Sequence, residues 1–166
     1  MLYLNHPQSQ PHSPETQRSL RAADGYLFFG LADEALEEIE SAPDPERELP
    51  EVLLARNRVL LHLKRWKEVE TLAAHGIETH PDRDEFTVQR AFALHKMKKG
   101  EEALSVLETA PEWIRRTGIL HYNLACYEAQ LGDIKTARQC INVAIQMNAA
   151  MRKNAKADPD LRGLWN

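Results

Sequence analysis

The stretch EALEEIESAP, residues 34–43, returns as EALSVLETAP at residues 102–111. Six of the ten residues are identical, and three of the four differences keep their polar or apolar character. The first copy begins at Glu34 and the second at Glu102, and self-similarity at a fixed interval is typical of repeat architectures. The sequence therefore predicts a chain built from repeated units.

Small residues recur along the chain at an interval of 34, which is half of the 68 positions between Glu34 and Glu102. Three columns with this interval consist mostly of alanine: Ala23, Asn57, Ala91 and Ala125; Ala35, Val69, Ala103 and Ala137; Ala42, Gly76, Ala110 and Ala144. Two more columns are apolar throughout: Phe29, Leu63, Met97 and Leu131; Ile39, Ala73, Leu107 and Ile141. Antiparallel helices approach closely only where their side chains are small, so the columns predict the crossing points of paired helices.

Each interval contains two helical segments separated by a turn. Four apolar residues recur at spacings of three and four, on one face of a helix: Leu120, Leu124, Tyr127 and Leu131. Gly132-Asp133 then interrupts the pattern, and an aspartate there is a favourable N-cap for a second helix from residue 134. Ser13-Pro14 gives a similar start signal for a helix to about residue 29, followed by another at about 32–41. We therefore expect an all-α fold of helical hairpins.

The segment HYNLACYEAQLGDIKTARQCINVAIQMN, residues 121–148, resembles the consensus of the tetratricopeptide repeat (TPR) family. Leu124 and Ala125 match its first helix, Gly132-Asp133 resembles its turn, and Ala137 and Ala144 its small second-helix positions. The resemblance covers about residues 16–149. It implies a right-handed α-solenoid of four helix-turn-helix repeats whose first helices line an inner, concave surface.

The resemblance also implies a domain organisation. Residues 14–149 are expected to hold the four repeats, at about 16–49, 50–83, 84–117 and 118–149. Residues 1–13, rich in Pro, Gln, Ser and His, are expected to form a disordered tail. The last repeat of a solenoid exposes an apolar face, so residues 150–166 are expected to cap it.

Three residues near the end are expected to fold back over the last hairpin: Leu161, Leu164 and Trp165. An alternative for Trp165 is that it stays exposed and anchors a partner.

Composition sets limits on the class of protein. Charged residues make up 28% and hydrophobic residues 43%, as in ordinary globular proteins, and a net charge of −4 leaves no overall footprint for nucleic acid. The two cysteines imply no disulfide framework. No apolar run approaches the length of about 18 residues that a membrane span needs. The start of the chain has no signal-peptide pattern. We expect a soluble, cytoplasmic protein.

The sequence offers few groups for catalysis. Phosphate-binding loops of the GxxxxGK[ST] or GxGxxG type are absent, as is a GxSxG nucleophile elbow. The seven histidines include no HxxxH pair, and CxxC does not occur. His121 and Cys126 are five residues apart, on different faces of one helix. We therefore expect no enzyme activity, no cofactor and no metal.

Binding remains as the expected function. The resemblance implies that eleven residues face the groove: Leu20, Leu27, Leu54, Arg58, Leu61, His62, Val88, Phe92, His95, Tyr122 and Asn123. This set is mixed but notably apolar, as in peptide-binding surfaces. Phe92 and Tyr122 are the expected anchors, and Arg58 and Asn123 the expected orienting groups. Alternatively, the N-terminal tail or neighbouring helices cover some of them.

Some members of the family clamp a partner's C-terminal carboxylates with lysine, arginine and asparagine on the first helices. This sequence has Leu20, Asp24, Leu54 and Arg58 at those positions, so a clamp of that kind is not expected. A second candidate surface is EWIRRTG at residues 112–118, which combines Trp113 with basic residues.

These features predict a non-catalytic adaptor that binds a protein partner, as a monomer or weak homo-oligomer. The ending LACYEAQLGD…DPDLRGLW resembles bacterial kinesin light chain-like repeat proteins, which implies a tubulin-like filament subunit as partner. One alternative is a secretion-type chaperone that holds an apolar client segment. Another is a membrane-surface adaptor that uses four residues near the C-terminus: Arg152, Lys153, Lys156 and Trp165.

Overall fold

The start of the first helix shows how local sequence sets the elements. The structure, a computed structural model, describes residues 12–110, 112 and 117–165, and all regular secondary structure in them is helical. Helix α1 (Pro14–Phe28) begins at Ser13, whose Oγ accepts the backbone N–H of Thr16 at 3.2 Å. Pro14 at the first helical position has no N–H to leave unsatisfied. Ser13, the last residue of the predicted tail, is therefore the N-cap of α1, whereas residues 1–11 lie outside the described residues.

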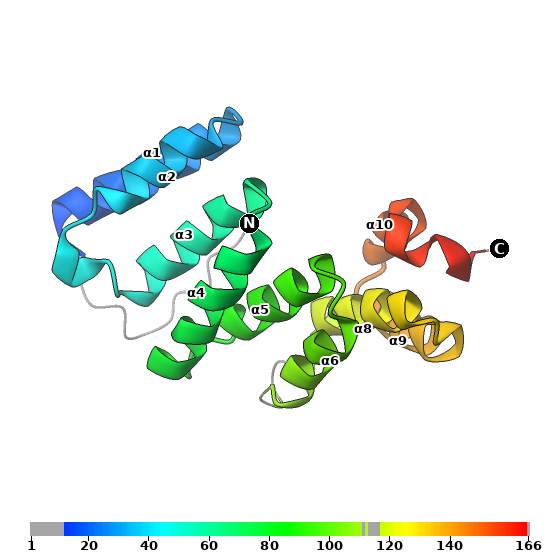
Figure 1. Cartoon of the computed structure of the whole chain (residues 1–166). Coiled ribbons are helices and arrows are strands. Elements are labelled where there is room, and N and C mark those ends of the chain that lie inside the picture. The colour runs from blue at the N-terminus through cyan, green and yellow to red at the C-terminus, as the bar shows by residue number, and fades with distance from the viewer. Residues whose placement is uncertain (1–11, 111, 113–116, 166) are drawn as a thin grey trace. The chain divides into compact units, whose positions relative to one another are not determined.

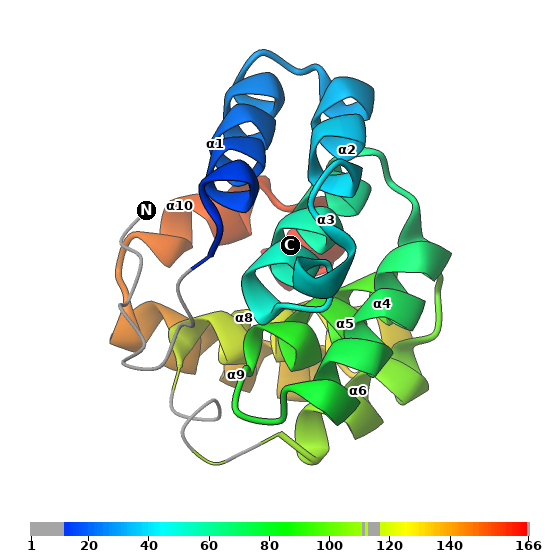
Figure 2. The same cartoon turned by 90° about the vertical axis from the view of Figure 1, so that its left-hand side faces the viewer.

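The chain divides into two compact units, Met1–Leu63 and Lys64–Asn166. In the first unit, α1 and α2 (Ala32–Glu40) pack side by side as a hairpin (Figure 2). A short 3₁₀ turn, η1 (Asp44–Glu46), leads to α3 (Pro50–His62), which packs against both helices. Glu46 ties η1 to the start of α1, because its carboxylate accepts the backbone N–H and the hydroxyl of Ser13.

The second unit is also built by helix-by-helix stacking within itself. Its elements are α4 (Trp66–Thr79), α5 (Glu85–Lys96), α6 (Gly100–Glu108), α8 (Gly118–Leu131), α9 (Ile134–Met147), α10 (Met151–Ala157) and the 3₁₀ turn η2 (Pro159–Leu164). Helix α4 packs on α5, α5 on α6, α6 on α8, and α8 on α9 (Figure 1). Neighbours in sequence are thus neighbours in space, as in an α-solenoid.

The three alanine-rich columns form the buried crossing points in both units. Every member of these columns is buried, including Asn57, which is 0% exposed. The approach is close at Gly76 of α4, where an added Cβ would overlap the ring of Phe86 on α5. Phe86 is itself fully buried, so its ring takes the space that a side chain at position 76 would need. The predicted role of the small residues is confirmed.

The interval of 34 also appears in the backbone. Within the described ranges, the residues with left-handed conformation are Gly30, Lys64, Lys98 and Gly132, with φ of 76°, 56°, 65° and 91°. Gly30, Lys98 and Gly132 each follow the first helix of a packed pair, where a left-handed residue ends the helix and reverses the chain, and Lys64 follows the end of α3. Glycine adopts this conformation without strain, whereas lysine does so at a cost. Two of these four turns therefore form although their residues do not favour them.

One apolar column is not uniformly buried. Leu131 packs against Gly100 of the preceding hairpin, where an added Cβ would lie 3.0 Å from Leu131 Cδ2. Phe29 holds the equivalent position in the first hairpin, and no helix precedes α1 in the described residues. Phe29 is therefore 75% exposed and Phe28 is 86% exposed, with their rings edge to face at 5.3 Å. We call Phe28 and Phe29 the aromatic tip.

The C-terminal residues cover the last hairpin. Turn η2 packs on α8, α9 and α10, with Leu161 and Leu164 buried in the core of the second unit. Trp165 stays 40% exposed, and its indole N–H donates to the carbonyl of Ala155 at 3.1 Å. The expected fold-back therefore holds for both leucines and only in part for Trp165. None of the helices in the described ranges is long and apolar enough to span a bilayer.

Candidate functional site

In the first unit, the predicted groove residues lie on two adjacent helices. Leu20 and Leu27 are on α1, and Leu54 and Leu61 are on α3, which packs beside it. All four leucines are half-buried. Because the spacings of four and three residues repeat on both helices, each pair of leucines shares a face with the charged residue between them.

That charged residue is Asp24 on α1 and Arg58 on α3, and the two form an ion pair 34 residues apart in sequence. Their side chains remain 46% and 32% exposed, so water reaches the pair. His62 is exposed, and its Nδ1 lies 2.9 Å from the carbonyl oxygen of Arg58. We define the α1/α3 face by six residues: Leu20, Asp24, Leu27, Leu54, Arg58 and Leu61.

The α1/α3 face combines apolar area with an exchangeable charge pair. When a partner covers one of these half-buried leucines, the rest of its apolar surface leaves water. Each leucine covered in this way contributes about 1 kcal/mol to binding. Exposed ion pairs contribute little to stability, so Arg58 can exchange Asp24 for a partner's carboxylate at small cost. This chemistry suits an apolar peptide or helix with an acidic group.

In the second unit, the predicted residues lie on α5 and α8, which are also in contact. Val88, Phe92, Tyr122 and Asn123 are half-buried, whereas His95 is 1% exposed. Phe92 meets Trp66 edge to face at 6.1 Å, and Lys96 Nζ lies 5.2 Å from the centre of its ring. Phe92 therefore already has an aromatic and a cationic neighbour within its own unit.

The chain's own C-terminal residues occupy the rest of this surface. The Tyr122 hydroxyl donates to Asp158 Oδ2 at 2.8 Å, and Asp160 Oδ2 accepts from Lys96 Nζ at 3.0 Å. His95 Nε2 lies 2.9 Å from the same oxygen of Asp160. Two predicted groove residues, His95 and Tyr122, thus contact aspartates near the C-terminus of the same chain. Whether any of the eleven residues binds a partner stays a prediction.

Sequence reasoning missed the two aspartates as groove contacts. Asp158-Pro159 is a helix-start signal, and Asp158 does cap η2 by accepting the backbone N–H of Asp160 at 2.9 Å. A second signal was present in the spacing, because Asp158 and Asp160 offer two carboxylates two residues apart. Their partners could not be read from the sequence, because η2 reaches α5 as well as the last hairpin.

Burial and charge shift the pKa values of this cluster. Burial lowers the pKa of His95 below its ordinary value, and the bond to Asp160 offsets this only in part. Burial acts to raise the pKa of Asp160, but hydrogen bonds from His95 and Lys96 outweigh it, so the pKa is lowered. His95 is thus neutral and Asp160 ionised near neutral pH. The ring of His95 also stacks on Tyr127 with centroids 4.6 Å apart.

Cys126, Asp158 and Asp160 have ligand atoms within 4.8 Å of one another, a spacing that could hold a metal ion. The donors do not fit one. Lys96 Nζ already neutralises Asp160 at 3.0 Å, and burial together with Asp158 raises the pKa of the Cys126 thiol. The Cys126 thiol is thus a neutral donor to Asp158, with Sγ 3.9 Å from its Oδ2. We assign the cluster to the network that holds η2.

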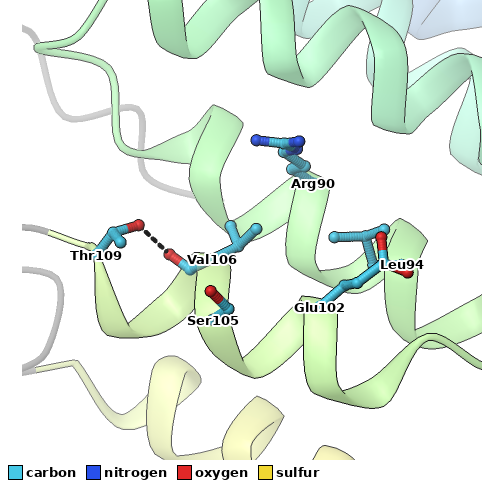
Figure 3. A pocket seen from close by; sticks show the side chains of 6 residues that line it. All are labelled: Arg90, Leu94, Glu102, Ser105, Val106 and Thr109. Atoms are coloured by element: carbon cyan, nitrogen blue, oxygen red, sulfur yellow. Dashed lines mark hydrogen bonds between the residues drawn. The ribbon is translucent and has the colours of Figure 1, made fainter.

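A separate pocket of about 360 Å³ lies between α5 and α6 (Figure 3). Its lining residues are Arg90, Leu94, Glu102, Ser105, Val106 and Thr109. Three of these side chains are already engaged. Arg90 Nε donates to Glu70 Oε1, the Thr109 hydroxyl donates to the Val106 carbonyl, and Glu102 accepts from Lys99 Nζ at 3.1 Å. No histidine or cysteine is among these lining residues, and the one carboxylate among them belongs to Glu102, which pairs with Lys99.

The other predicted surfaces receive less structural detail. Trp113 and the residues 114–116 of the EWIRRTG segment lie outside the described residues. On α10, the basic residues Arg152, Lys153 and Lys156 are exposed. Trp165 would have to give up its bond to Ala155 to enter a lipid surface.

Comparison with solved structures shows the fold. MamA 41-end from Desulfovibrio magneticus RS-1 is 17% identical, with a TM-score of 0.74 over 89% of this chain and 83% of its own. TTC0263, described as a thermophilic TPR protein in Thermus thermophilus, is 21% identical, with a TM-score of 0.75 over 90% and 81%. No protein-family model and no curated protein matches the sequence. The predicted all-α fold of the right-handed α-solenoid class, with a C-terminal cap, is confirmed.

Proposed function

We propose that this chain, which shares its fold with a TPR protein, is a non-catalytic adaptor that binds a protein partner through the α1/α3 face. The observation that carries the proposal is the set of four half-buried leucines around the Asp24–Arg58 pair. These leucines form a patch on two adjacent helices rather than single scattered residues, and such patches are typical of interaction surfaces.

The face favours a protein ligand over a small molecule. Its groups come from two parallel rows on neighbouring helices and are spaced along them by whole helical turns. An extended peptide or an amphipathic helix can contact several turns at once, whereas a small molecule is usually held in an enclosed pocket. The pocket in the second unit lies elsewhere, between α5 and α6.

For the partner itself, a bacterial tubulin-like filament subunit is the first candidate, on the resemblance of the chain's ending to kinesin light chain-like proteins. A chaperone that holds an apolar client segment is the alternative, and the leucines of the α1/α3 face favour it equally. Co-sedimentation separates the two. A filament adaptor pellets with polymerised subunits and not with free ones, whereas a chaperone binds a soluble client.

Site-specific photo-crosslinking in cells tests the proposal. A benzophenone side chain placed at Leu54 or Leu61 is expected to give an adduct with a protein partner. Leu54→Glu combined with the probe at Leu61 is expected to abolish the adduct, because a carboxylate replaces apolar area in the centre of the face. Arg56→Glu is the matched control, since it adds the same group two residues along α3, where Arg56 pairs with Glu40.

Two outcomes contradict the proposal. One is that adducts form equally at Leu54 and at an exposed residue of the outer helix α4, such as His75. The other is a turnover of a small molecule that survives purification and depends on a residue of the α1/α3 face.

A further inference from the structure

The C-terminal residues show what kind of ligand the α5/α8 surface accepts. We define the C-terminal arm as residues 151–165, which comprise α10 and η2, and the α5/α8 face as His95, Lys96, Tyr122 and Cys126. Every residue of this face contacts a carboxylate of the arm, through Asp158 or Asp160. Leu161 follows directly and is fully buried. The face thus receives the pattern Asp-x-Asp-Leu.

The α5/α8 face is chemically specific for such an occupant. It presents an ammonium group, a buried imidazole and a hydroxyl, which can all donate to acidic oxygens. The side chain of His95 is only 2% exposed, so without a carboxylate its Nε2 would be left in the interior unbonded. A neutral or basic segment would leave these donors unmatched.

The attachment of the arm combines a small apolar part with polar contacts that water reaches. Within α10, Ala155 is the one buried residue. The ion pair of Asp160 with Lys96 is reached by water, since the two side chains are 22% and 34% exposed. Such pairs stabilise only modestly. Leu161 and Leu164 supply the apolar part of the attachment, and a ligand with a leucine after its second aspartate can replace the first of them.

We propose that the α5/α8 face is a second docking site, for an acidic partner segment of the pattern Asp-x-Asp-Leu, and that the C-terminal arm is its resident competitor. This rests on the proposed adaptor function but uses a different surface and unit. A partner then binds only to the fraction of molecules in which the arm has left, so its apparent affinity is its intrinsic affinity multiplied by that fraction. The arm sets how readily the second site opens.

A peptide-binding experiment on the full chain tests this. The probe is a labelled peptide of the arm's own sequence, ADPDLRGLW, residues 157–165, measured by fluorescence polarisation. Asp160→Asn weakens the arm but leaves the face intact, so the peptide is expected to bind about tenfold more tightly than to the wild type. Lys96→Gln is the matched control. It also loosens the arm, but it removes the ammonium group from the face, so no gain in affinity is expected.

Alkylation of Cys126 reports arm opening independently. Residue Cys126 is 6% exposed and its thiol lies against Asp158, so departure of the arm uncovers this side of it. Both variants are expected to speed its modification several-fold relative to Cys140, which the arm's polar contacts do not involve. A control peptide with both aspartates replaced by asparagine is expected to bind neither variant.

Several results would overturn the proposal. One is an equal gain in peptide affinity for Asp160→Asn and Lys96→Gln. Another is that the asparagine peptide binds as tightly as the aspartate peptide. A third is that Asp160→Asn shows no gain in peptide affinity although its Cys126 has become accessible to alkylation. A concentration-dependent dimer of Asp160→Asn that excludes the peptide would assign the face to a second copy instead. If Asp160→Asn loses helical circular dichroism, Leu164→Ala provides the loosened arm, with the same expected gain and the same test against Lys96→Gln. Leu54→Glu should leave peptide binding unchanged, so failure of the α1/α3 proposal and failure of this one are distinguishable.

Discussion

Lys98→Gly should stabilise the second unit although it removes a side chain. Lys98 has φ of 65°, a left-handed conformation that costs a residue with a Cβ about 1–2 kcal/mol. Glycine relieves that strain but loses more backbone freedom on folding, which costs about 0.5–1 kcal/mol. The side chain of Lys98 is exposed, so little packing is lost. The net expectation is a gain of about 0.5–1 kcal/mol in the free energy of unfolding.

The reciprocal change at the equivalent turn should have the opposite sign. Gly132 has φ of 91°, and an added Cβ there meets nothing within 4 Å. Gly132→Ala therefore introduces backbone strain without a clash, and about 1 kcal/mol of destabilisation is expected. Lys99→Gly is the matched control. Lys99 has φ of −104°, so glycine relieves nothing there and the ion pair with Glu102 is lost.

Urea unfolding followed by far-UV circular dichroism measures all three variants, with hydrogen exchange at the amides of α5 and α6 to assign the change to the second unit. Backbone strain at Lys98 is refuted if Lys98→Gly is neutral or destabilising while Gly132→Ala is tolerated. It is also refuted if Lys99→Gly stabilises as much as Lys98→Gly, because the effect would then not depend on backbone conformation.

Three further changes have defined outcomes. Gly76→Ala should lower the midpoint of thermal unfolding, because overpacking against Phe86 costs about 1–3 kcal/mol and exceeds the helix-propensity gain of about 1 kcal/mol. Gly25→Ala should raise the midpoint, because an added Cβ there meets nothing within 4 Å. The stability contributed by His95 is present above pH 6.5 and is lost as the pH falls below it, because the folded state lowers its pKa. Lower hydrogen-exchange protection factors in η2 on acidification, corrected for the slower intrinsic exchange of amides at lower pH, check this. Ser13→Ala should cost the first unit about 1 kcal/mol in urea unfolding through loss of the N-cap, and Ser13→Thr should retain most of it.

The fold could be predicted because its cause is repeated in the sequence. Alanine at a crossing point, as at Ala91 or Ala125, reports close helix packing directly, and the constant interval between such alanines shows that the same crossing recurs. The left-handed turns were harder to see. Gly132 marks one, but Lys98 adopts the same conformation, imposed by the packing of α5 on α6 rather than by its own preference.

The candidate site was only partly predictable for a related reason. The helical spacing shows which residues share a face, and Asp24 and Arg58 do meet as their equivalent positions suggest. What covers a face depends on contacts between segments far apart in sequence. His95 is buried because Asp160, 65 residues later, returns to it, and no local pattern around either residue indicates that pairing.

The aromatic tip has a consequence for how the chain could be extended by design. Leu131 packs against Gly100 of the preceding hairpin, whereas Phe29, at the equivalent position of the first hairpin, is exposed to solvent. In the described part of the chain, no helix packs against this edge of the first hairpin. An extra hairpin spliced in ahead of α1, with glycine opening its second helix as in α6, would meet that edge in register. The final hairpin, by contrast, has η2 folded across it. A designed repeat is therefore better added before α1 than after α9.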